Sequence, residues 1–214
     1  MTITHSLQRR LNMLGIFARY YADHLVGQGY PKSVDKIFAF LTIHEKQTLY
    51  RLARALPPNA QLVEIGSYLG GSSCCLAAGI MGKQSELHCI DTFMADNVNS
   101  EDRHDTFTQF TANTQPYAEA IRVHRGFSYD VVGEIAGPID LLFVDGDHSW
   151  EGVTQDLKLY IPLMKTDGIL ILHDSAYPPV QRALKEIVLP AESQRLATLP
   201  NMYAGRIRPA DVRF

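Results

Sequence analysis

From residue 61 onwards, short apolar segments alternate with segments whose apolar residues recur every three or four positions. The first kind predicts strands and the second predicts helices. Strands that alternate with helices fold into a mostly parallel sheet that helices cover on both faces. The expected strands are residues 62–66, 86–91, 121–125, 139–145 and 168–173. The expected helices are residues 71–81, 103–115, 128–135, 150–163 and 178–188.

The segments outside this alternation predict further elements at both ends of the chain. Residues 194–199 and 203–208 flank Pro200-Asn201 and predict an antiparallel hairpin. The sequence Thr42-Ile43-His44-Glu45 is a capping box, which predicts a helix that ends before Pro57-Pro58. Apolar residues at helical spacing between residues 7 and 25 predict an amphipathic helix. That helix could pack on the domain flank, cover a ligand cleft or join a homodimer.

We therefore expect an α/β fold of the Rossmann-like, doubly wound class. Its mostly parallel, seven-stranded sheet and C-terminal antiparallel hairpin would occupy residues 43–214, after a helical extension in residues 1–42. A chain of 214 residues is long enough for one such core.

Composition excludes several classes of protein. Hydrophobic residues make up 46% of the chain and charged residues 20%, as in an ordinary globular domain. A net charge of −3 argues against a nucleic-acid partner, and no apolar run approaches the roughly 20 residues that cross a bilayer. The three cysteines form neither a paired framework nor a metal-binding spacing. Because no leader is evident either, we expect a cytoplasmic protein with no membrane partner.

A glycine-rich turn joins the first expected strand to the next helix. Glu64 lies near the end of the strand, Gly66 and Gly70-Gly71 permit a tight turn, and Ser72 opens the helix. In an open α/β sheet, ligands bind at such turns. Tyr68 stands where the dinucleotide fingerprint needs its second glycine, which argues against a nicotinamide-dependent oxidoreductase. A turn without any ligand is the structural alternative.

The next two strand ends offer groups that suit a nucleoside. Asp91 closes the second strand, where a carboxylate can accept hydrogen bonds from both ribose hydroxyls. A solvated acid at a strand end is the alternative, but the neighbouring glycine turn favours ribose binding. Gly126-Phe127-Ser128 follow the third strand, where adenine would lie if Asp91 held the ribose. Ser128 could instead serve only as a helix N-cap.

The fourth and fifth strands end in clusters of polar residues. Residues 145–151 read D-G-D-H-S-W-E, and His173-Asp174-Ser175 follow the fifth strand. If the two strands are neighbours, about 4.8 Å apart, the oxygens of Asp145 and Asp174 can meet at one point. Two close carboxylates repel each other unless a proton or a cation intervenes. Mg²⁺ or another divalent cation would fit there, with helix capping and solvation of the acids as the alternative.

Taken in order, these motifs resemble those of class I S-adenosylmethionine-dependent methyltransferases. The chain is more narrowly similar to the small O-methyltransferases related to the catechol and caffeoyl-CoA enzymes, and to a bacterial subgroup that carries V-D-G-D-H-S and a later H-D. The resemblance covers residues 43–188 and implies methyl transfer to a hydroxyl of a small molecule, such as a sugar, a phenol or another natural-product alcohol. The matching motifs are Glu64-Ile65-Gly66, Asp91, Gly126-Phe127-Ser128, residues 144–149 and His173-Asp174.

The resemblance also implies roles for single residues. Asp145 and His148 would be catalytic, with His148 as the base where the catechol-type family has a lysine. Asp145 and Asp174 would bind a divalent cation. Ser175 stands where that family has a third metal ligand, an asparagine, so the third ligand is open. The residues expected to contact S-adenosylmethionine are Glu64, Gly66, Ser67, Tyr68, Ser72, Asp91, Thr92, Phe127, Ser128 and Asp145.

Other functions fit parts of the pattern. A nicotinamide-dependent oxidoreductase would share the fold, and a non-catalytic S-adenosylmethionine-binding module would share the cofactor site. A metal-dependent hydrolase could use Asp145 and Asp174, but it would leave the glycine turn without a role. We expect the acceptor pocket to form from the N-terminal helix and from residues 93–103 and 177–182.

Overall fold

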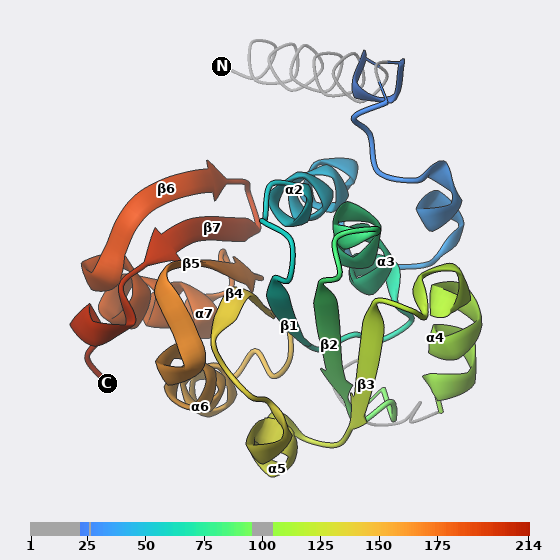
Figure 1. The fold of residues 1–214 in the computed structure, drawn as a ribbon. Coiled ribbons are helices and arrows are strands. Elements are labelled where there is room, and N and C mark those ends of the chain that lie inside the picture. The colour runs from blue at the N-terminus through green and yellow to red at the C-terminus, as the bar shows by residue number, and fades with distance from the viewer. Residues whose placement is uncertain (1–21, 26, 96–104) are drawn as a thin grey trace, which may run out of the picture.

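A seven-stranded sheet forms the centre of the computed structural model, which describes residues 22–25, 27–95 and 105–214. Its strands are β1 (Gln61–Ile65), β2 (Glu86–Asp91), β3 (Ile121–Arg125), β4 (Ile139–Val144), β5 (Met164–His173), β6 (Glu192–Thr198) and β7 (Met202–Ile207). The strand order is β3-β2-β1-β4-β5-β7-β6, and β7 runs opposite in direction to the other six strands (Figure 1). The predicted α/β class, the mostly parallel sheet and the C-terminal hairpin are confirmed.

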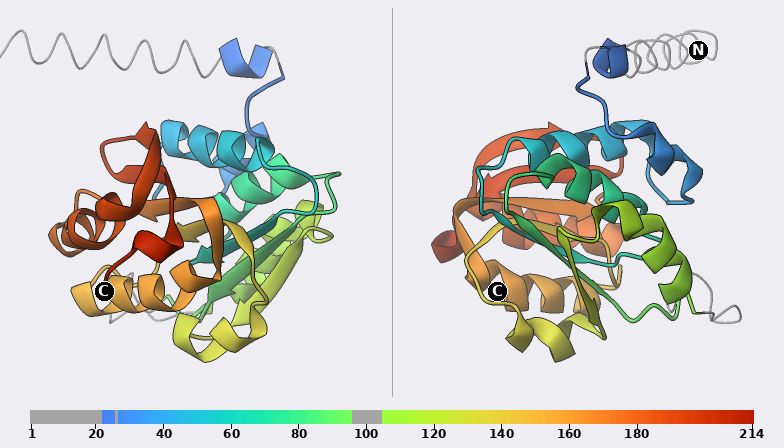
Figure 2. Two further views of the ribbon diagram at one scale, coloured as in Figure 1. Left: turned by 60° about the vertical axis from the view of Figure 1, so that its left-hand side comes forward. Right: turned by 45° about the vertical axis from the view of Figure 1, so that its right-hand side comes forward.

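Helices cover both faces of this sheet (Figures 1 and 2). On one face lie α2 (Ile43–Arg54), α3 (Gly71–Ile80) and α4 (Phe107–Thr114). On the other face lie α5 (Ser128–Val131), α6 (Trp150–Tyr160) and α7 (Pro178–Ala183). Short helical turns are η1 (Lys32–Lys36), η2 (Gln115–Tyr117), η3 (Val132–Glu134), η4 (Ile161–Leu163), η5 (Leu184–Val188), η6 (Leu189–Ala191) and η7 (Pro209–Asp211).

Some element boundaries differ from the sequence predictions for local reasons. The helix expected at 150–163 is α-helical only to Tyr160 and ends in the 3₁₀ turn η4. Pro162 lies in that turn and has no N–H to continue the α-helix. Strand β5 begins at Met164, four residues earlier than expected, because Met164 pairs with Ile139 across an irregularity in the β4–β5 ladder.

The strand register brings several residues to one edge of the sheet. All six residues of β4 are buried, so this strand can present side chains to a ligand only beyond its end. Ile65 of β1 pairs with Val144 of β4, and Val144 pairs with Leu172 of β5. The segments that begin at Gly66, Asp145 and His173 therefore start at the same level, as expected for the carboxyl ends of parallel strands.

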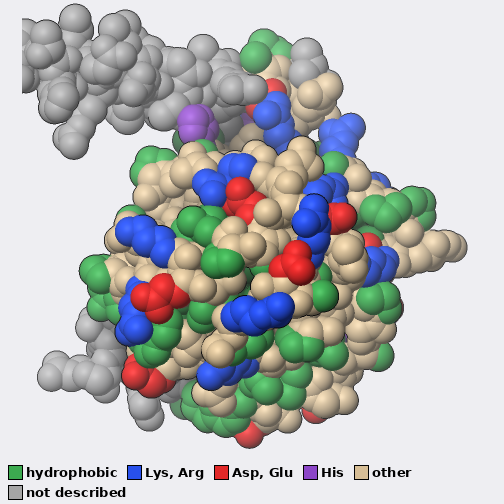
Figure 3. Space-filling model, turned by 90° about the vertical axis from the view of Figure 1, so that its left-hand side faces the viewer, with side chains coloured by type: hydrophobic (Ala, Val, Ile, Leu, Met, Phe, Trp, Pro, Cys, Tyr) green, Lys and Arg blue, Asp and Glu red, His purple; other side chains and the backbone are tan. Residues whose placement is uncertain are grey.

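The edge strand β6 carries charged side chains. Arg195 pairs with Glu192 and lies over the ring of Tyr203, 4.8 Å from its centroid. On the face of the molecule turned toward this edge, basic and acidic side chains are interspersed (Figure 3). Charges on an edge strand oppose its pairing with a further strand.

Most of the N-terminal extension lies outside the described residues. Of the helix expected between residues 7 and 25, only residues 22–25 are described, and they are helical. The division at residue 42 and the role of the extension stay predictions. Within the described part of the chain, no helix has the length and apolar character needed to cross a membrane.

Candidate active site

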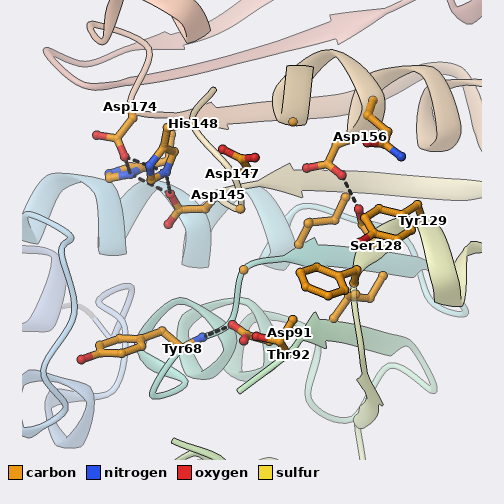
Figure 4. Close-up of a pocket in the computed structure, with 18 of the residues that line it drawn as sticks. Tyr68, Asp91, Thr92, Ser128, Tyr129, Asp145, Asp147, His148, Asp156 and Asp174 are labelled. Atoms are coloured by element: carbon orange, nitrogen blue, oxygen red, sulfur yellow. Dashed lines mark hydrogen bonds and ion pairs between the residues drawn. The ribbon is translucent and has the colours of Figure 1, made fainter. Parts of the chain in front are cut away.

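The carboxyl ends of the parallel strands open onto a cavity of about 680 Å³ (Figure 4). The segments that follow β1, β2, β3, β4 and β5 line it, together with Phe40 and with Asn201 from the β6–β7 turn. The predicted site residues on its wall are Gly66, Tyr68, Asp91, Thr92, Phe127, Ser128, Asp145, His148 and Asp174. Glu64, Ser67, Ser72 and Ser175 were also predicted for the site, and they do not line the cavity.

The turn after β1 is tight because β4 lies directly beside it. Gly66 has a φ of +87°, and a Cβ at this position would lie 2.1 Å from the carbonyl oxygen of Asp145. No residue with a side chain fits there without moving the backbone. Gly70 N–H closes the turn by donating to the carbonyl of Ser67 over 2.8 Å.

Glu64 supports this turn from beneath. Its side chain is fully buried, and Oε2 accepts hydrogen bonds from the hydroxyls of Ser67 and Ser73. Burial raises the pKa of Glu64, although hydroxyl hydrogen bonds oppose that shift. Its Oε1 has no hydrogen-bond partner among the described residues. Glu64 thus braces the turn in this structure, and contact with the cofactor stays a prediction.

Asp91 joins the first two strand ends. Its Oδ2 accepts the N–H of Ser67 over 2.8 Å and the N–H of Tyr68 over 2.7 Å. Its Oδ1 accepts the N–H of Phe93 over 2.6 Å. These bonds fix the carboxylate on the cavity wall, and a carboxylate oxygen with such bonds can still accept another hydrogen bond. The arrangement suits a pair of vicinal hydroxyls.

Ser128, just after β3, meets an acid from α6 that the sequence did not predict for the site. Ser128 begins α5, and its hydroxyl donates to Asp156 of α6 rather than capping a helix. Burial raises the pKa of Asp156 to about 6. Beside this pair, the rings of Phe127 and Tyr129 stack with their centroids 5.2 Å apart. Asp156 was missed, although an acid between the buried Val153 and Leu157 was a signal of a buried polar contact.

The ends of β4 and β5 bring two carboxylates and two imidazoles together. His173 Nδ1 lies 3.0 Å from Asp145 Oδ1 and 3.3 Å from Asp174 Oδ2. His148 Nε2 lies 3.0 Å from Asp174 Oδ2 and 3.5 Å from Asp145 Oδ1. Figure 4 shows Asp145, His148 and Asp174 pointing toward one another. The convergence of Asp145 and Asp174 that the sequence predicted is present in the structure.

These contacts shift the pKa values of the cluster. Burial lowers the pKa of His173, but its contacts with Asp145, Asp174 and Glu45 outweigh that effect and raise the pKa to about 12. The bond from His173 lowers the pKa of Asp174 to about 2, although burial opposes the shift. The hydrogen bond to Asp145 raises the pKa of His148, while burial opposes that effect. The cluster therefore favours the ionised form of Asp174.

One ligand atom each from Asp145, His148 and Asp174 lie within 4.8 Å of one another. Carboxylate oxygens are hard ligands that suit Mg²⁺, and an imidazole also suits softer divalent metals. The donor set thus fits a divalent cation.

Ser175, which was expected near the metal, and Asn201, which was not, both lie beside Asp174. Ser175 lies in the turn after β5, where its N–H donates to the carbonyl of Asn201 over 3.2 Å. The side-chain amide of Asn201 donates to Asp174 Oδ1 over 2.6 Å and lines the cavity. Asn201 was missed because it follows Asp174 by 27 residues and reaches the site only through the pairing of β7 with β5.

The polar segment 145–151 also contains Asp147, and the acceptor pocket was expected from the N-terminal helix and from residues 93–103 and 177–182. Asp147 Oδ1 accepts the N–H of Ser149 over 2.8 Å, so Asp147 shapes the turn before α6. In the predicted acceptor segment 93–103, Ala95 lines the cavity, and residues 96–104 lie outside the described residues. Tyr177, in the other predicted segment, is exposed and does not line the cavity.

Three solved structures share this fold at low sequence identity. An O-methyltransferase from Bacillus cereus in complex with SAH has a TM-score of 0.67 at 13% identity and covers 89% of this chain and 97% of its own. The O-methyltransferase NovP has a TM-score of 0.66 at 16% identity, and the match covers 79% of this chain and 82% of NovP. The O-methyltransferase TomG from Streptomyces achromogenes, in complex with SAM, has a TM-score of 0.59 at 14% identity. The match covers 78% of this chain and 81% of TomG. Such identities establish the fold alone.

Sequence comparison identifies the family. The curated protein y4gI of Sinorhizobium fredii (strain NBRC 101917 / NGR234), described as uncharacterized, is 26% identical over 127 residues. That match spans 58% of this chain and only 14% of the relative. The profile of the family described as methyltransferase domain matches residues 63–175, which is more than half of the chain. The match covers strands β1 to β5 except the first two residues of β1. The chain therefore belongs to the methyltransferase domain family.

Proposed function

We propose that this enzyme transfers a methyl group to a hydroxyl of a small molecule, such as a sugar, a phenol or another natural-product alcohol, with the help of a divalent cation. The observation that carries the proposal is that one cavity joins the glycine turn and Asp91 to the cluster of Asp145, His148 and Asp174. S-adenosylmethionine supplies an electrophilic methyl group. The protein must then align the acceptor oxygen and remove its proton.

The ends of β1, β2 and β3 would bind the nucleoside and the amino-acid part of the cofactor. Asp91 would accept the two ribose hydroxyls, since its carboxylate is already fixed by three backbone N–H groups. The N–H groups that open α3 beside Gly66 and Tyr68 would favour a carboxylate. Phe127, Ser128 and neighbouring Thr92 would contact the base and the ribose. Glu64, Ser67 and Ser72 do not line the cavity, so they would contribute by holding the turn in shape.

Asp145 and Asp174 would hold the divalent cation. When bound, such a cation lowers the pKa of an acceptor hydroxyl and stabilises the resulting alkoxide. Asn201 is better placed than Ser175 to provide a third protein oxygen, because its amide already contacts Asp174 on the cavity wall. A rotation of that amide would present its oxygen instead of its nitrogen.

His148 would accept the proton of the acceptor hydroxyl. Its side chain is 36% exposed and lines the cavity, so a bound acceptor could reach it. The contacts of His148 with Asp145 and Asp174 orient the ring. The neutral imidazole is the form that acts as a general base, and because Asp145 raises the pKa of His148, the neutral fraction grows as the pH rises.

A methyl-transfer assay tests the proposal. The purified protein is incubated with S-adenosylmethionine labelled in its methyl group and with a panel of sugars, phenols and aliphatic alcohols. We expect label in an O-methyl product, its loss with EDTA and its return with excess Mg²⁺. Label found only on nitrogen or carbon acceptors would contradict the hydroxyl acceptor, and transfer undiminished by EDTA would remove the cation from the account.

A binding experiment separates the nicotinamide alternative. Calorimetric titration of the protein with S-adenosylhomocysteine and with NAD should give binding of the first only, because Tyr68 obstructs the close approach of a pyrophosphate.

A further inference from the structure

Glu45 lies buried behind the acid and imidazole cluster, on a helix that contributes no other residue to it. It is the third residue of α2, and its side chain is 2% exposed. Its Oε2 accepts the N–H of Thr42 over 2.7 Å and the Thr42 hydroxyl over 2.8 Å. Its Oε1 faces His173 Nε2 at 3.7 Å. Oε2 of Glu45 therefore caps the helix through Thr42, while Oε1 faces His173.

His173 lies between Glu45 and the two aspartates. Its Nδ1 is 3.0 Å from Asp145 Oδ1 and 3.3 Å from Asp174 Oδ2. Its Nε2 is buried and has no hydrogen-bond partner among the described residues. Glu45 is the acid that faces this second nitrogen. The orientation of the ring therefore depends on carboxylates on both of its sides.

The capping box alone does not account for a carboxylate at this position. A glutamine serves the same capping position as a glutamate. A buried carboxylate also carries a desolvation cost that an amide avoids in part. The cost is offset where the charge faces a cation or a hydrogen-bond donor, and His173 is the group that Oε1 faces.

We propose that Glu45 is a positioning residue, which orients the His173 ring so that Nδ1 holds Asp145 and Asp174 in place to bind a divalent cation. The inference rests on the cation of the proposed function. Residues that support metal ligands in this indirect way typically change metal affinity by about 10- to 100-fold when they are replaced.

Three variants separate this role from helix capping. Glu45→Gln keeps a capping group of the same shape and removes the carboxylate from His173. Thr42→Ala removes the N-cap and leaves the carboxylate. Asp145→Asn removes a proposed ligand and shows whether a cation binds at this cluster. Each protein is titrated with Mn²⁺ and followed by electron paramagnetic resonance, and with S-adenosylhomocysteine by calorimetry.

A second readout does not depend on the cation. In metal-free protein labelled with ¹⁵N-histidine, the ring resonances of His173, assigned with a His173→Asn variant, report the hydrogen bonds of both nitrogens. Glu45→Gln should shift these resonances, and Thr42→Ala should leave them nearly unchanged. Unchanged resonances in Glu45→Gln would overturn the contact itself.

In the titrations, Glu45→Gln should weaken Mn²⁺ binding about tenfold or more and change S-adenosylhomocysteine affinity less than twofold. Thr42→Ala should lower the melting temperature and keep the Mn²⁺ affinity. Equal Mn²⁺ affinity in wild type and Glu45→Gln would overturn the positioning role while leaving the cation in place. Absence of Mn²⁺ binding to wild type would overturn both the positioning role and the cation, and the histidine resonances would still report whether the contact exists.

Discussion

Gly66 packs so closely against Asp145 that a Cβ on residue 66 would lie 2.1 Å from the carbonyl oxygen of Asp145. The two residues follow Ile65 and Val144, which pair in neighbouring strands. The glycine turn and the acid cluster therefore begin at adjacent points of one sheet edge. A change at residue 66 should disturb both halves of the cavity.

Gly66→Ala should lower stability more than the same change at another glycine with positive φ. Gly82 is the matched control, because its φ is +73° and a Cβ there would meet nothing within 4 Å. We expect Gly82→Ala to cost about 1–2 kcal/mol, from left-handed backbone strain alone. Gly66→Ala adds a clash worth about 1–3 kcal/mol, giving about 2–5 kcal/mol. Urea unfolding of both variants measures the difference, and equal losses would contradict the close packing.

Asp91→Asn should weaken S-adenosylhomocysteine binding. The amide keeps the shape but replaces one acceptor oxygen with an NH₂ group that faces backbone N–H groups. Loss of a hydrogen bond to a charged group costs about 1.5–3 kcal/mol, or roughly 10- to 100-fold in affinity. Asp130→Asn on the exposed side of α5 makes the same chemical change and should leave the affinity measured by calorimetry unchanged. An equal loss of S-adenosylhomocysteine affinity in Asp91→Asn and Asp130→Asn would show that Asp91 does not bind the cofactor.

His148→Ala should slow methyl transfer far more than it weakens cofactor binding. Loss of a general base typically costs about 10²- to 10⁴-fold in rate. Steady-state kinetics with a hydroxyl acceptor gives kcat, and calorimetry with S-adenosylhomocysteine gives the affinity. The base role fails if kcat is retained while cofactor affinity is lost.

Asp156 should make the folded state less stable as the pH rises. Burial raises the pKa of its carboxyl from 3.8 to about 6, so between these values the folded state binds more protons than the unfolded state. The stability this carboxyl contributes is present below pH 4 and is lost as the pH passes 6. Asp156→Asn cannot lose a proton, so its stability relative to wild type should rise by about 2–3 kcal/mol between pH 4 and pH 7.

Urea unfolding at both pH values checks this difference, with Asp130→Asn as the exposed control. A pH-independent difference between wild type and Asp156→Asn would mean that Asp156 ionises normally in the folded protein.

The sequence predicted the part of the site that depends on strand ends. Asp91, Asp145 and Asp174 each close a strand with a clear apolar pattern, and the carboxyl ends of parallel strands share one edge of the sheet. Glycine spacing predicted the turn because Gly66 and Gly70 both need positive φ. In these cases, local pattern and fold class together determine the position of the residue.

Residues that reach the site through long-range packing could not be predicted in this way. Asn201 contacts Asp174 because β7 inserts between β5 and β6, a choice of partner that the hairpin sequence does not contain. Glu45 already has a sufficient local explanation in its capping box, which hid its contact with His173. Asp156 was missed because helical acids are usually solvated, and its burial follows from the packing of α6 on the sheet.

A crystal structure of the protein with S-adenosylhomocysteine and Mg²⁺ tests the central claim most directly. The account predicts the ribose hydroxyls on Asp91, the homocysteine part over residues 66–71, and the metal on Asp145 and Asp174 beside the sulfur. A nucleoside bound elsewhere, or the carboxylates of Asp145 and Asp174 turned away from the sulfur, would contradict it.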